Sequence, residues 1–271
     1  MPELPEIYTL SKQMENELVG KKITDIEVVQ EKCLNIGKDE FITQVSNKMI
    51  QSITSLGKWI FIGLDADAKL ALSLGMGGDV VYHEDAASSL PSKYQFKITF
   101  TDSSCLTIKF WWFGYFHLVK EGEKNYHKQT DKLGVSPLDK SQFTYEYFYG
   151  MLNEKRGSIK SFLMDQKYVA GIGNVYIQDI LFRAKLRPDR KINTMDDSEK
   201  SLLYSAICEE LQEAVELGGI VQERDLYNKP GKKYNFLVGY KEGRPCPVCG
   251  REISKITVAN TACYICSSCQ K

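Results

Sequence analysis

The apolar residues at the start of the chain recur at the spacing of a helix. Steps of three and four residues connect Leu4, Ile7, Leu10, Met14 and Leu18. Residues at this spacing lie on one helical face, and Gly20 follows as a stop signal. The pattern predicts an amphipathic helix that holds the N-terminus against a core.

The pattern changes between about Lys22 and Val119. Short apolar or alternating runs, typical of strands, occupy Ile23–Val29, Trp59–Leu64, Leu70–Leu74, Gln95–Thr101, Leu106–Phe110 and Phe113–Val119. Gly, Asp, Ser and Asn separate these runs, and no long helical period lies between them. We therefore expect an antiparallel sandwich or barrel.

A polar and charged stretch between Lys120 and Asp139 predicts an interdomain hinge. Helical periodicity follows and predicts helices over Phe143–Leu152, Ile159–Gln166, Val175–Ala184 and Glu199–Leu217. Gly218-Gly219 ends the last helix, and a long polar loop centred on Asn228-Lys229-Pro230-Gly231 follows. A strand-rich part before a helical part predicts an α+β fold with two domains.

Composition favours a globular protein without a membrane partner. Of the 271 residues, 43% are hydrophobic and 26% are charged, which excludes a disordered or fibrous chain. The apolar runs are shorter than the roughly 20 residues of a membrane-spanning helix, and the N-terminus lacks the pattern of a signal peptide. We expect a cytoplasmic location. The formal net charge of zero argues by itself against nucleic acid as a partner.

The cysteines near the end of the chain have the spacing of a zinc site. Cys246 and Cys249 form one Cys-x-x-Cys pair, and Cys266 and Cys269 form a second pair, with sixteen residues between the two pairs. Two such pairs give four thiolates for tetrahedral zinc, with a β-hairpin between them. Four ligands close the coordination shell, so the zinc is expected to be structural. Cys263 forms an overlapping pair with Cys266 and is a competing ligand.

The sequence Met1-Pro2-Glu3-Leu4-Pro5-Glu6 offers a candidate nucleophile. Removal of Met1 would leave the secondary amine of Pro2 as the free N-terminus, next to a carboxylate. An α-amino group titrates near neutrality, so a useful fraction is uncharged and able to attack an electrophilic carbon. Most chains that begin Met-Pro are simply processed N-termini, so the motif alone does not establish catalysis.

Several motifs in one order give the chain a family resemblance. They are the Met1–Glu6 start, Leu74-Gly75-Met76-Gly77-Gly78, Leu133-Gly134, the run from Ile159 to Lys167, Gly171-Ile172-Gly173-Asn174, Arg187-Pro188-Asp189-Arg190 and the four-cysteine tail. Together they resemble the formamidopyrimidine-DNA glycosylase and endonuclease VIII family of base-excision repair enzymes, over essentially the whole chain.

The resemblance implies a domain order and a partner. Residues 1–120 would form a catalytic helix and β-sandwich, 121–139 a hinge, 140–235 a helix-two-turn-helix domain with a lesion-loop region, and 236–271 a zinc finger. Damaged double-stranded DNA would lie in the cleft between the two domains, bound by a monomer. The loop Ile220–Asn235 corresponds to the segment that covers a flipped base in the formamidopyrimidine branch.

The resemblance also implies the chemistry of the N-terminus. A damaged base is flipped out of the duplex, and the amine of Pro2 attacks the sugar carbon C1′ as the base leaves. The resulting iminium acidifies the C2′ proton, so strand cleavage by β- and then δ-elimination follows. Glu3 would transfer a proton at the deoxyribose ring oxygen, with support from Glu6. A helix first-turn acid that stabilises the dipole is the structural alternative for Glu6.

Five further residues are candidates to contact DNA. Lys58, in a predicted strand segment, matches the family lysine that contacts a phosphate, with a strand-surface lysine as its alternative. Asn174 begins a predicted helix after two glycines, where backbone amides and a side-chain amide can hold a phosphate. Lys160 is a further candidate phosphate contact, with a solvated helix face as its alternative. Met76 would enter the gap left by the flipped base, and Phe113 would wedge beside it. In a strand-rich domain, Met and Phe are otherwise usually core residues.

Two positions depart from the family pattern. Trp111 lies in Phe110-Trp111-Trp112-Phe113-Gly114, where the formamidopyrimidine branch has an arginine that reads the base opposite the lesion. Indole offers one donor and a large stacking surface, so we expect stacking to replace hydrogen bonding and opposite-base preference to relax. Thr261 stands where an arginine usually clamps the phosphates, and Arg251 or Lys255 are the candidates to compensate.

The sequence therefore favours a bifunctional DNA glycosylase with AP lyase activity. A damage- or structure-specific DNA-binding protein with little catalysis on the same scaffold is the alternative from another class. A zinc ribbon protein that contacts other proteins is the third. Oxidised purines and oxidised pyrimidines both remain open as substrates.

Overall fold

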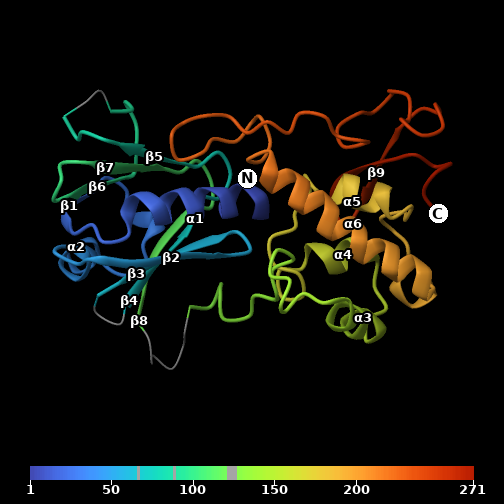
Figure 1. Cartoon of the computed structure of the whole chain (residues 1–271), viewed down its shortest axis with the longest axis horizontal. Coiled ribbons are helices and arrows are strands. Elements are labelled where there is room, and N and C mark those ends of the chain that lie inside the picture. The colour runs from blue at the N-terminus through green and yellow to red at the C-terminus, as the bar shows by residue number, and fades with distance from the viewer. Residues whose placement is uncertain (66–67, 88–89, 121–126) are drawn as a thin grey trace. The chain divides into compact units, whose positions relative to one another are not determined.

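The computed structural model describes residues 1–65, 68–87, 90–120 and 127–271, and it divides the chain into two compact units (Figure 1). The first unit contains Met1–Asp131 and Gly218–Lys232. The second contains Lys132–Leu217 and Lys233–Lys271. Part of the expected hinge, residues 121–126, lies outside the described residues. None of the helices in the described ranges is long and apolar enough to cross a membrane.

The first unit begins with the predicted amphipathic helix, α1 (Leu4–Leu18). Glu3 is its N-cap, and the Glu6 carboxylate accepts a hydrogen bond from the Glu3 backbone N–H at 2.9 Å, as in a capping box. Ile7 and Met14 are fully buried on the face that packs on the strands. The helix therefore anchors the N-terminal residues to a hydrophobic core, as expected.

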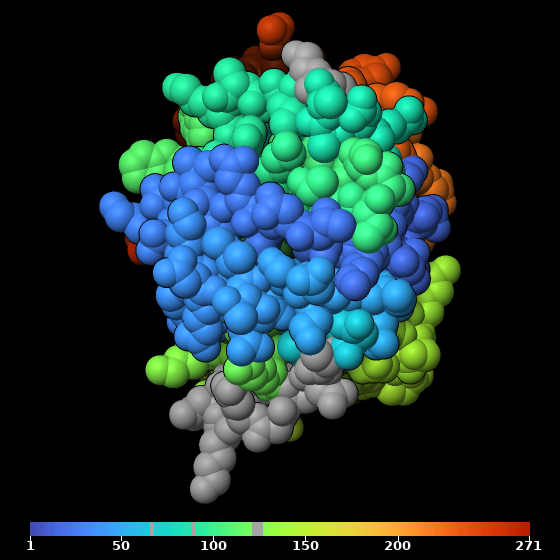
Figure 2. Space-filling view, turned by 90° about the vertical axis from the view of Figure 1, so that its left-hand side faces the viewer, coloured from blue at the N-terminus to red at the C-terminus, as the bar shows by residue number. Residues whose placement is uncertain are grey.

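Two four-stranded antiparallel sheets share this core. One has the order β1-β6-β7-β5 and the other the order β2-β3-β4-β8. Their bounds are β1 (Ile23–Val28), β2 (Ile50–Leu56), β3 (Trp59–Leu64), β4 (Ala68–Ser73), β5 (Asp79–His83), β6 (Phe96–Phe100), β7 (Cys105–Lys109) and β8 (Tyr115–Lys120). Residues of α1 and of both sheets form one apolar cluster, which confirms the sandwich. The blue and green residues of this unit fill the foreground of Figure 2.

Four elements of the first unit lack a clear pattern in the sequence. A short 3-10 helix, η1 (Glu31–Cys33), precedes α2 (Lys38–Val45), in which only Phe41 and Val45 are buried. Two buried positions are too few to establish a helical period. Strand β2 is rich in Ser and Thr, and β5 is mostly half-buried, so neither has the apolar alternation of the strands that were predicted.

The second unit is mostly helical and ends in a hairpin. Its elements are α3 (Tyr145–Asn153), α4 (Ile159–Met164), α5 (Ile177–Arg183), η2 (Ile192–Thr194), α6 (Asp197–Glu216), β9 (Ser254–Val258) and β10 (Thr261–Ile265). Asp196 and Glu199 form a reciprocal capping box that starts α6. Strands β9 and β10 pair antiparallel around a turn at Ala259 and Asn260, both with positive φ. The predicted helices are present, although α4 and α5 are shorter than expected.

The segment Gly218–Lys232 belongs to the first unit, although the expected domain order placed it with the helices. Its side chains and backbone bond to α1. Gln13 accepts from the Leu226 N–H at 3.0 Å, and Glu17 accepts from the Tyr227 hydroxyl at 2.6 Å. These bonds explain why the segment lies in the first unit, because polar side chains of α1 bind a loop that is about 200 residues later in the chain.

Candidate active site

The first turn of α1 buries two carboxylates beside Pro2. Pro2, Glu3 and Glu6 are all buried, with Glu3 only 3% exposed. One oxygen of Glu6 accepts from the Glu3 N–H, and the other accepts from the Ile220 N–H at 3.0 Å. Glu6 therefore joins the N-terminal turn to the segment Gly218–Lys232. It acts as a cap, as its structural alternative predicted, and it also positions Glu3.

Gly219 is required at the point where this segment meets Glu6. Its φ is +87°, and an added Cβ would lie 2.6 Å from the Glu6 carboxylate. A side chain at this position would be strained by the backbone conformation and would also displace the carboxylate. The Gly218-Gly219 pair is thus more than a helix stop, because it allows the chain to approach the N-terminal turn closely.

The N-terminal ammonium faces a third carboxylate, which the sequence did not single out. Met1 N lies 3.1 Å from Glu223 Oε1. Glu223 is in the same recruited segment as Ile220. In the sequence, the polar loop that contains Glu223 follows directly after Gly218-Gly219. This pattern draws attention to the loop, but it does not single out Glu223 among the loop's polar residues.

Lys58 lies in a turn and not in a strand, which corrects the expected placement. Gly57 and Lys58 form the two-residue connection between β2 and β3, and Gly57 has a φ of +61°. Positive φ at the first position suits a tight hairpin turn that follows the twist of the strands. Lys58 is half-exposed there. The Ser11 hydroxyl bonds that of Ser55 at 3.0 Å and so links α1 to the strand that leads into this turn.

A buried histidine pair, also missed in the sequence, lies next to this turn. His117 on β8 bonds His127 through their ring nitrogens, and Trp59 packs edge-on against His127 with ring centroids 5.0 Å apart. Burial, followed by the neighbouring His127, lowers the pKa of His117 to about 4. Burial also lowers the pKa of His127, while Asp131 opposes that shift. The pair is therefore neutral at pH 7.

Met76, Trp111 and Phe113 are exposed, contrary to the usual location of such residues in a core. Trp111 is 71% exposed and Phe113 69%, and Met76 is also exposed. Backbone hydrogen bonds of 2.9 and 3.3 Å between Met76 and Trp112 hold the two loops together. Trp112 is exposed as well, so these two hydrogen-bonded loops carry four exposed large apolar side chains, which is unusual for side chains without a partner.

In the second unit, Asn174 lies in the turn before α5 and contacts the hairpin through Gln178. Gln178 Nε2 donates to the Asn174 Oδ1 at 3.2 Å and to the Ala262 carbonyl at 3.3 Å. The Gln178 oxygen accepts from the Tyr264 N–H at 3.0 Å. Because its oxygen is bonded, the amide nitrogen of Asn174 is the group suited to donate to a phosphate. Sequence reasoning missed Gln178, since its role depends on a contact 84 residues away.

Lys160 does not have the exposure that a direct phosphate contact requires, so that expectation is corrected. Its side chain is fully buried. The ammonium donates to the Thr261 hydroxyl at 2.6 Å, to the Val258 carbonyl at 3.2 Å and to the Cys263 sulfur at 2.8 Å. Lys160 therefore fixes the hairpin turn from beneath. Thr261, half-buried at the first position of β10, is one of its acceptors.

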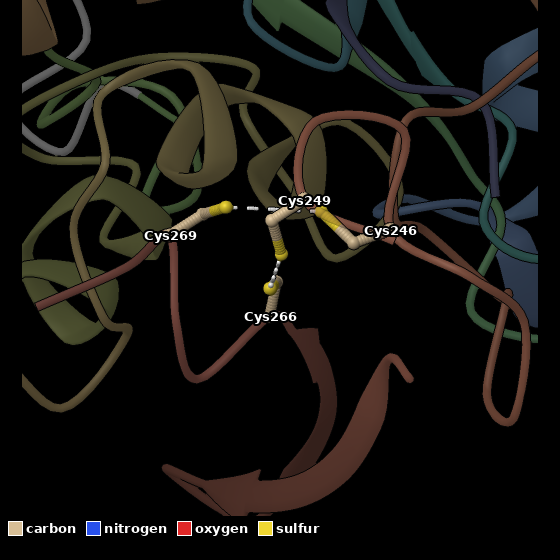
Figure 3. Close-up of side chains that lie close together, drawn as sticks. All are labelled: Cys246, Cys249, Cys266 and Cys269. Carbon is tan, nitrogen blue, oxygen red and sulfur yellow. Dashed lines mark hydrogen bonds between the residues drawn. The ribbon is translucent and has the colours of Figure 1, made fainter. Parts of the chain in front are cut away.

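Four cysteines converge as their spacing predicted (Figure 3). The sulfur atoms of Cys246, Cys249, Cys266 and Cys269 all lie within 4.8 Å of one another. The separations from Cys246 to Cys269 and from Cys249 to Cys266 are 3.8 and 3.4 Å. A tetrahedral zinc with Zn–S bonds near 2.3 Å has edges of roughly 3.8 Å, so the four sulfurs fit that ion. Cys263 is outside this group and contacts Lys160 instead.

Models of two known protein domains match the chain, one for most of the first unit and one for most of the helical part that follows. The formamidopyrimidine-DNA glycosylase N-terminal domain matches residues 1–110, and the H2TH domain of the same enzyme matches residues 133–225. The formamidopyrimidine-DNA glycosylase of Pelotomaculum thermopropionicum is 35% identical over 100% of this chain and 99% of its own length. That of Bacillus subtilis is 33% identical, again over 100% and 99%.

Solved structures give the same result. The Lactococcus lactis Fpg bound to DNA containing an abasic site has a TM-score of 0.88 and 28% identity, covering 99% of each chain. The same protein bound to DNA containing N7-benzyl-Fapy-dG has a TM-score of 0.88 and 29% identity over 100% of each chain. With matching domains, full-length relatives and a common fold, the chain belongs to the formamidopyrimidine-DNA glycosylase family.

Proposed function

We propose that the chain is a base-excision DNA glycosylase with AP lyase activity that acts through Pro2. The observation that carries this proposal is the N-terminal turn, which buries Glu3 and Glu6 beside Pro2 in a chain of this family. Buried carboxylates next to an amine supply the acid and base that an iminium mechanism needs. We also expect the enzyme to act as a monomer in the cytoplasm.

The reaction requires the glycosidic bond of the damaged nucleotide to be exposed and then attacked at C1′. The damaged nucleotide leaves the base stack, and the neutral Pro2 nitrogen forms a bond to C1′ while the base departs with the electron pair of the glycosidic bond. The nitrogen, now a cation, loses its N–H proton, and the lone pair so restored expels the ring oxygen O4′, which takes a proton from Glu3. The iminium so formed acidifies the C2′ proton, and loss of that proton expels the 3′ phosphate by β-elimination. A δ-elimination can follow.

The exposed apolar surface of the first unit supports a role in stabilising the disrupted duplex. Met76 and Phe113 are the proposed wedge at the position of the flipped base, since large apolar side chains fill gaps between unstacked bases. Trp111 would stack on the opposite base, with its indole largely exposed. Lys58 and Asn174 are the proposed phosphate contacts, each from its own unit.

The four-cysteine group is proposed to hold one structural zinc ion. Cys246, Cys249, Cys266 and Cys269 would be its ligands, and the bound ion would stabilise the second unit's hairpin. This hairpin presents Thr261 in place of the expected arginine. Lys160 holds the turn, but its buried ammonium does not replace the lost surface charge.

Borohydride trapping tests the proposed function. Oligonucleotides would carry an abasic site, formamidopyrimidine, 8-oxoguanine, thymine glycol or dihydrouracil opposite each base. Because the similar Lactococcus structures hold abasic and Fapy-dG DNA, we expect covalent adducts first on those substrates. Pro2→Gly, which replaces the secondary amine by a primary amine, should form the adduct more slowly than wild type, and Glu3→Gln should slow it strongly. Binding without any adduct, abasic DNA included, would establish the alternative of a DNA-binding protein without catalysis.

A further inference from the structure

The α-amino group of the chain is paired with an acid from a distant segment. Met1 N lies 3.1 Å from Glu223 Oε1, and the Glu223 side chain is 13% exposed. The Met1 side chain is 42% exposed, so the amine borders solvent while the carboxylate that faces it is mostly buried. Glu223 is therefore placed to act on the N-terminal nitrogen.

Backbone contacts hold the segment at Glu223 in place, so that the position of its backbone does not depend on Met1. The Glu223 N–H donates to the Ile220 carbonyl at 3.1 Å, and the Gly231 N–H donates to the Glu223 carbonyl at 3.3 Å. Ile220 is itself bonded to Glu6 on α1. Farther along, Gln13 bonds the same segment. After Met1 is removed, these bonds remain.

Neither Glu3 nor Glu6, the other two carboxylates near the amine, is assigned to remove the proton from the Pro2 nitrogen. Both oxygens of Glu6 accept backbone N–H groups, from Glu3 and Ile220. Such bonds favour the ionised form, so Glu6 is poorly suited to carry a proton. Glu3 is assigned to the ring oxygen. The Pro2 nitrogen, however, also has to lose a proton.

We propose that Glu223 accepts the proton of the Pro2 nitrogen, an inference that rests on the function proposed above. Removal of Met1 moves the terminal nitrogen by one residue, at most about 3.6 Å, which keeps it near this carboxylate. When the Pro2 nitrogen bonds to C1′, it becomes a cation that still carries its N–H proton. Glu223 takes this proton, which restores the nitrogen lone pair. The lone pair then forms the C=N bond as the C1′–O4′ bond breaks, and O4′ receives a proton from Glu3.

Three carboxylates lie close to the N-terminal turn: Glu3 at the N-cap of α1, Glu6 in its first turn, and Glu223 from the segment Gly218–Lys232. Replacement of Glu223 by a neutral isostere keeps the size of the side chain and removes the proposed proton acceptor.

The test uses full-length, zinc-loaded protein whose loss of Met1 has been verified by mass spectrometry. Single-turnover borohydride trapping on abasic DNA would be measured between about pH 5 and pH 9, across the titration of an α-amino group. Glu223→Gln should slow trapping at the high-pH plateau by about 100-fold, as expected for loss of a general base. Glu223→Asp, which keeps the carboxylate, should recover part of the rate.

Tyr227→Phe is the matched control, because it breaks a bond between the same segment and α1 without touching the N-terminus. It should trap at the wild-type rate. An unchanged plateau in Glu223→Gln would overturn the inference. Equal losses in Glu223→Gln and Tyr227→Phe would also overturn it, because they would indicate that the residues only hold the segment in place. If wild-type protein forms no adduct, the proposed function itself fails. If wild type forms an adduct and Glu223→Gln traps at the same rate, the role of Glu223 is refuted while the proposed function stands.

Discussion

Acidification should destabilise the first unit through the buried pair of His117 and His127. The pKa of His117 is lowered to about 4 by burial and by His127. The unfolded chain therefore binds a proton near pH 6.5, whereas the folded chain binds it only near pH 4. Stability is fully present above pH 6.5 and falls as the pH drops towards 4.

The magnitude follows from the pKa difference. Each unit of pKa shift corresponds to about 1.4 kcal/mol, and between pH 7 and pH 5 the His117 difference amounts to about 2 kcal/mol. The pKa of His127 is lowered as well, so its contribution has the same sign. A loss of this size is a substantial fraction of a typical domain's stability.

Tryptophan fluorescence during urea unfolding measures this loss in the correct unit. All three tryptophans, Trp59, Trp111 and Trp112, lie in the first unit, and only Trp59 is buried. Trp59 packs against His127, so its emission should change when the pair is released. The free energy of unfolding would be determined at pH 7 and pH 5 with zinc in excess.

His117→Gln provides the control for this measurement. A glutamine can still bond His127 but does not titrate, so the variant should lose about 2 kcal/mol less than wild type between the two pH values. Other titrating groups, including the zinc ligands, contribute equally to both proteins. Equal losses in wild type and variant would show that His117 is not a neutral buried group, and the reasoning would be refuted.

Three further predictions concern the departures from the family and the metal. Thr261→Arg should restore a phosphate contact and steepen the dependence of log K on log salt by about 0.9, measured by fluorescence anisotropy; an unchanged slope would mean that the hairpin turn does not reach phosphate. Trp111→Arg should increase discrimination between opposite bases by about 1–3 kcal/mol, measured as cleavage opposite C relative to A, and equal ratios in both proteins would contradict stacking by Trp111. Chelation should release one zinc ion per chain and abolish DNA binding while tryptophan emission stays constant, since all tryptophans lie in the other unit. Loss of emission with the metal would contradict an independent first unit.

Local patterns predicted the elements whose residues are close in sequence. The spacing from Leu4 to Leu18 identified α1, because that helix buries a complete apolar stripe. The two cysteine pairs identified the metal-binding group, because each pair lies on one short turn. Only the approach of one pair to the other depends on the tertiary fold. Helix α2 has two buried residues and escaped recognition. Lys58 follows a single glycine, Gly57, and precedes the apolar run of β3, and that pattern does not fix where the turn ends and the strand begins.

The contacts that define the site were beyond such patterns, because they join residues far apart in sequence. Glu6 looks like a first-turn acid until its second oxygen is seen to accept from Ile220. Lys160 looks like a solvated lysine until its ammonium is found beneath the hairpin, bonded to Thr261. In both cases a charged side chain pairs with backbone or hydroxyl groups of another segment, and burial makes that pairing necessary, since an unpaired buried charge is strongly disfavoured. Residue type therefore indicated which groups carry chemistry, whereas their division between catalysis and scaffolding was decided by tertiary contacts. Glu223 is a further example, because it belongs to no sequence motif and only the tertiary fold brings its carboxylate to the N-terminal amine.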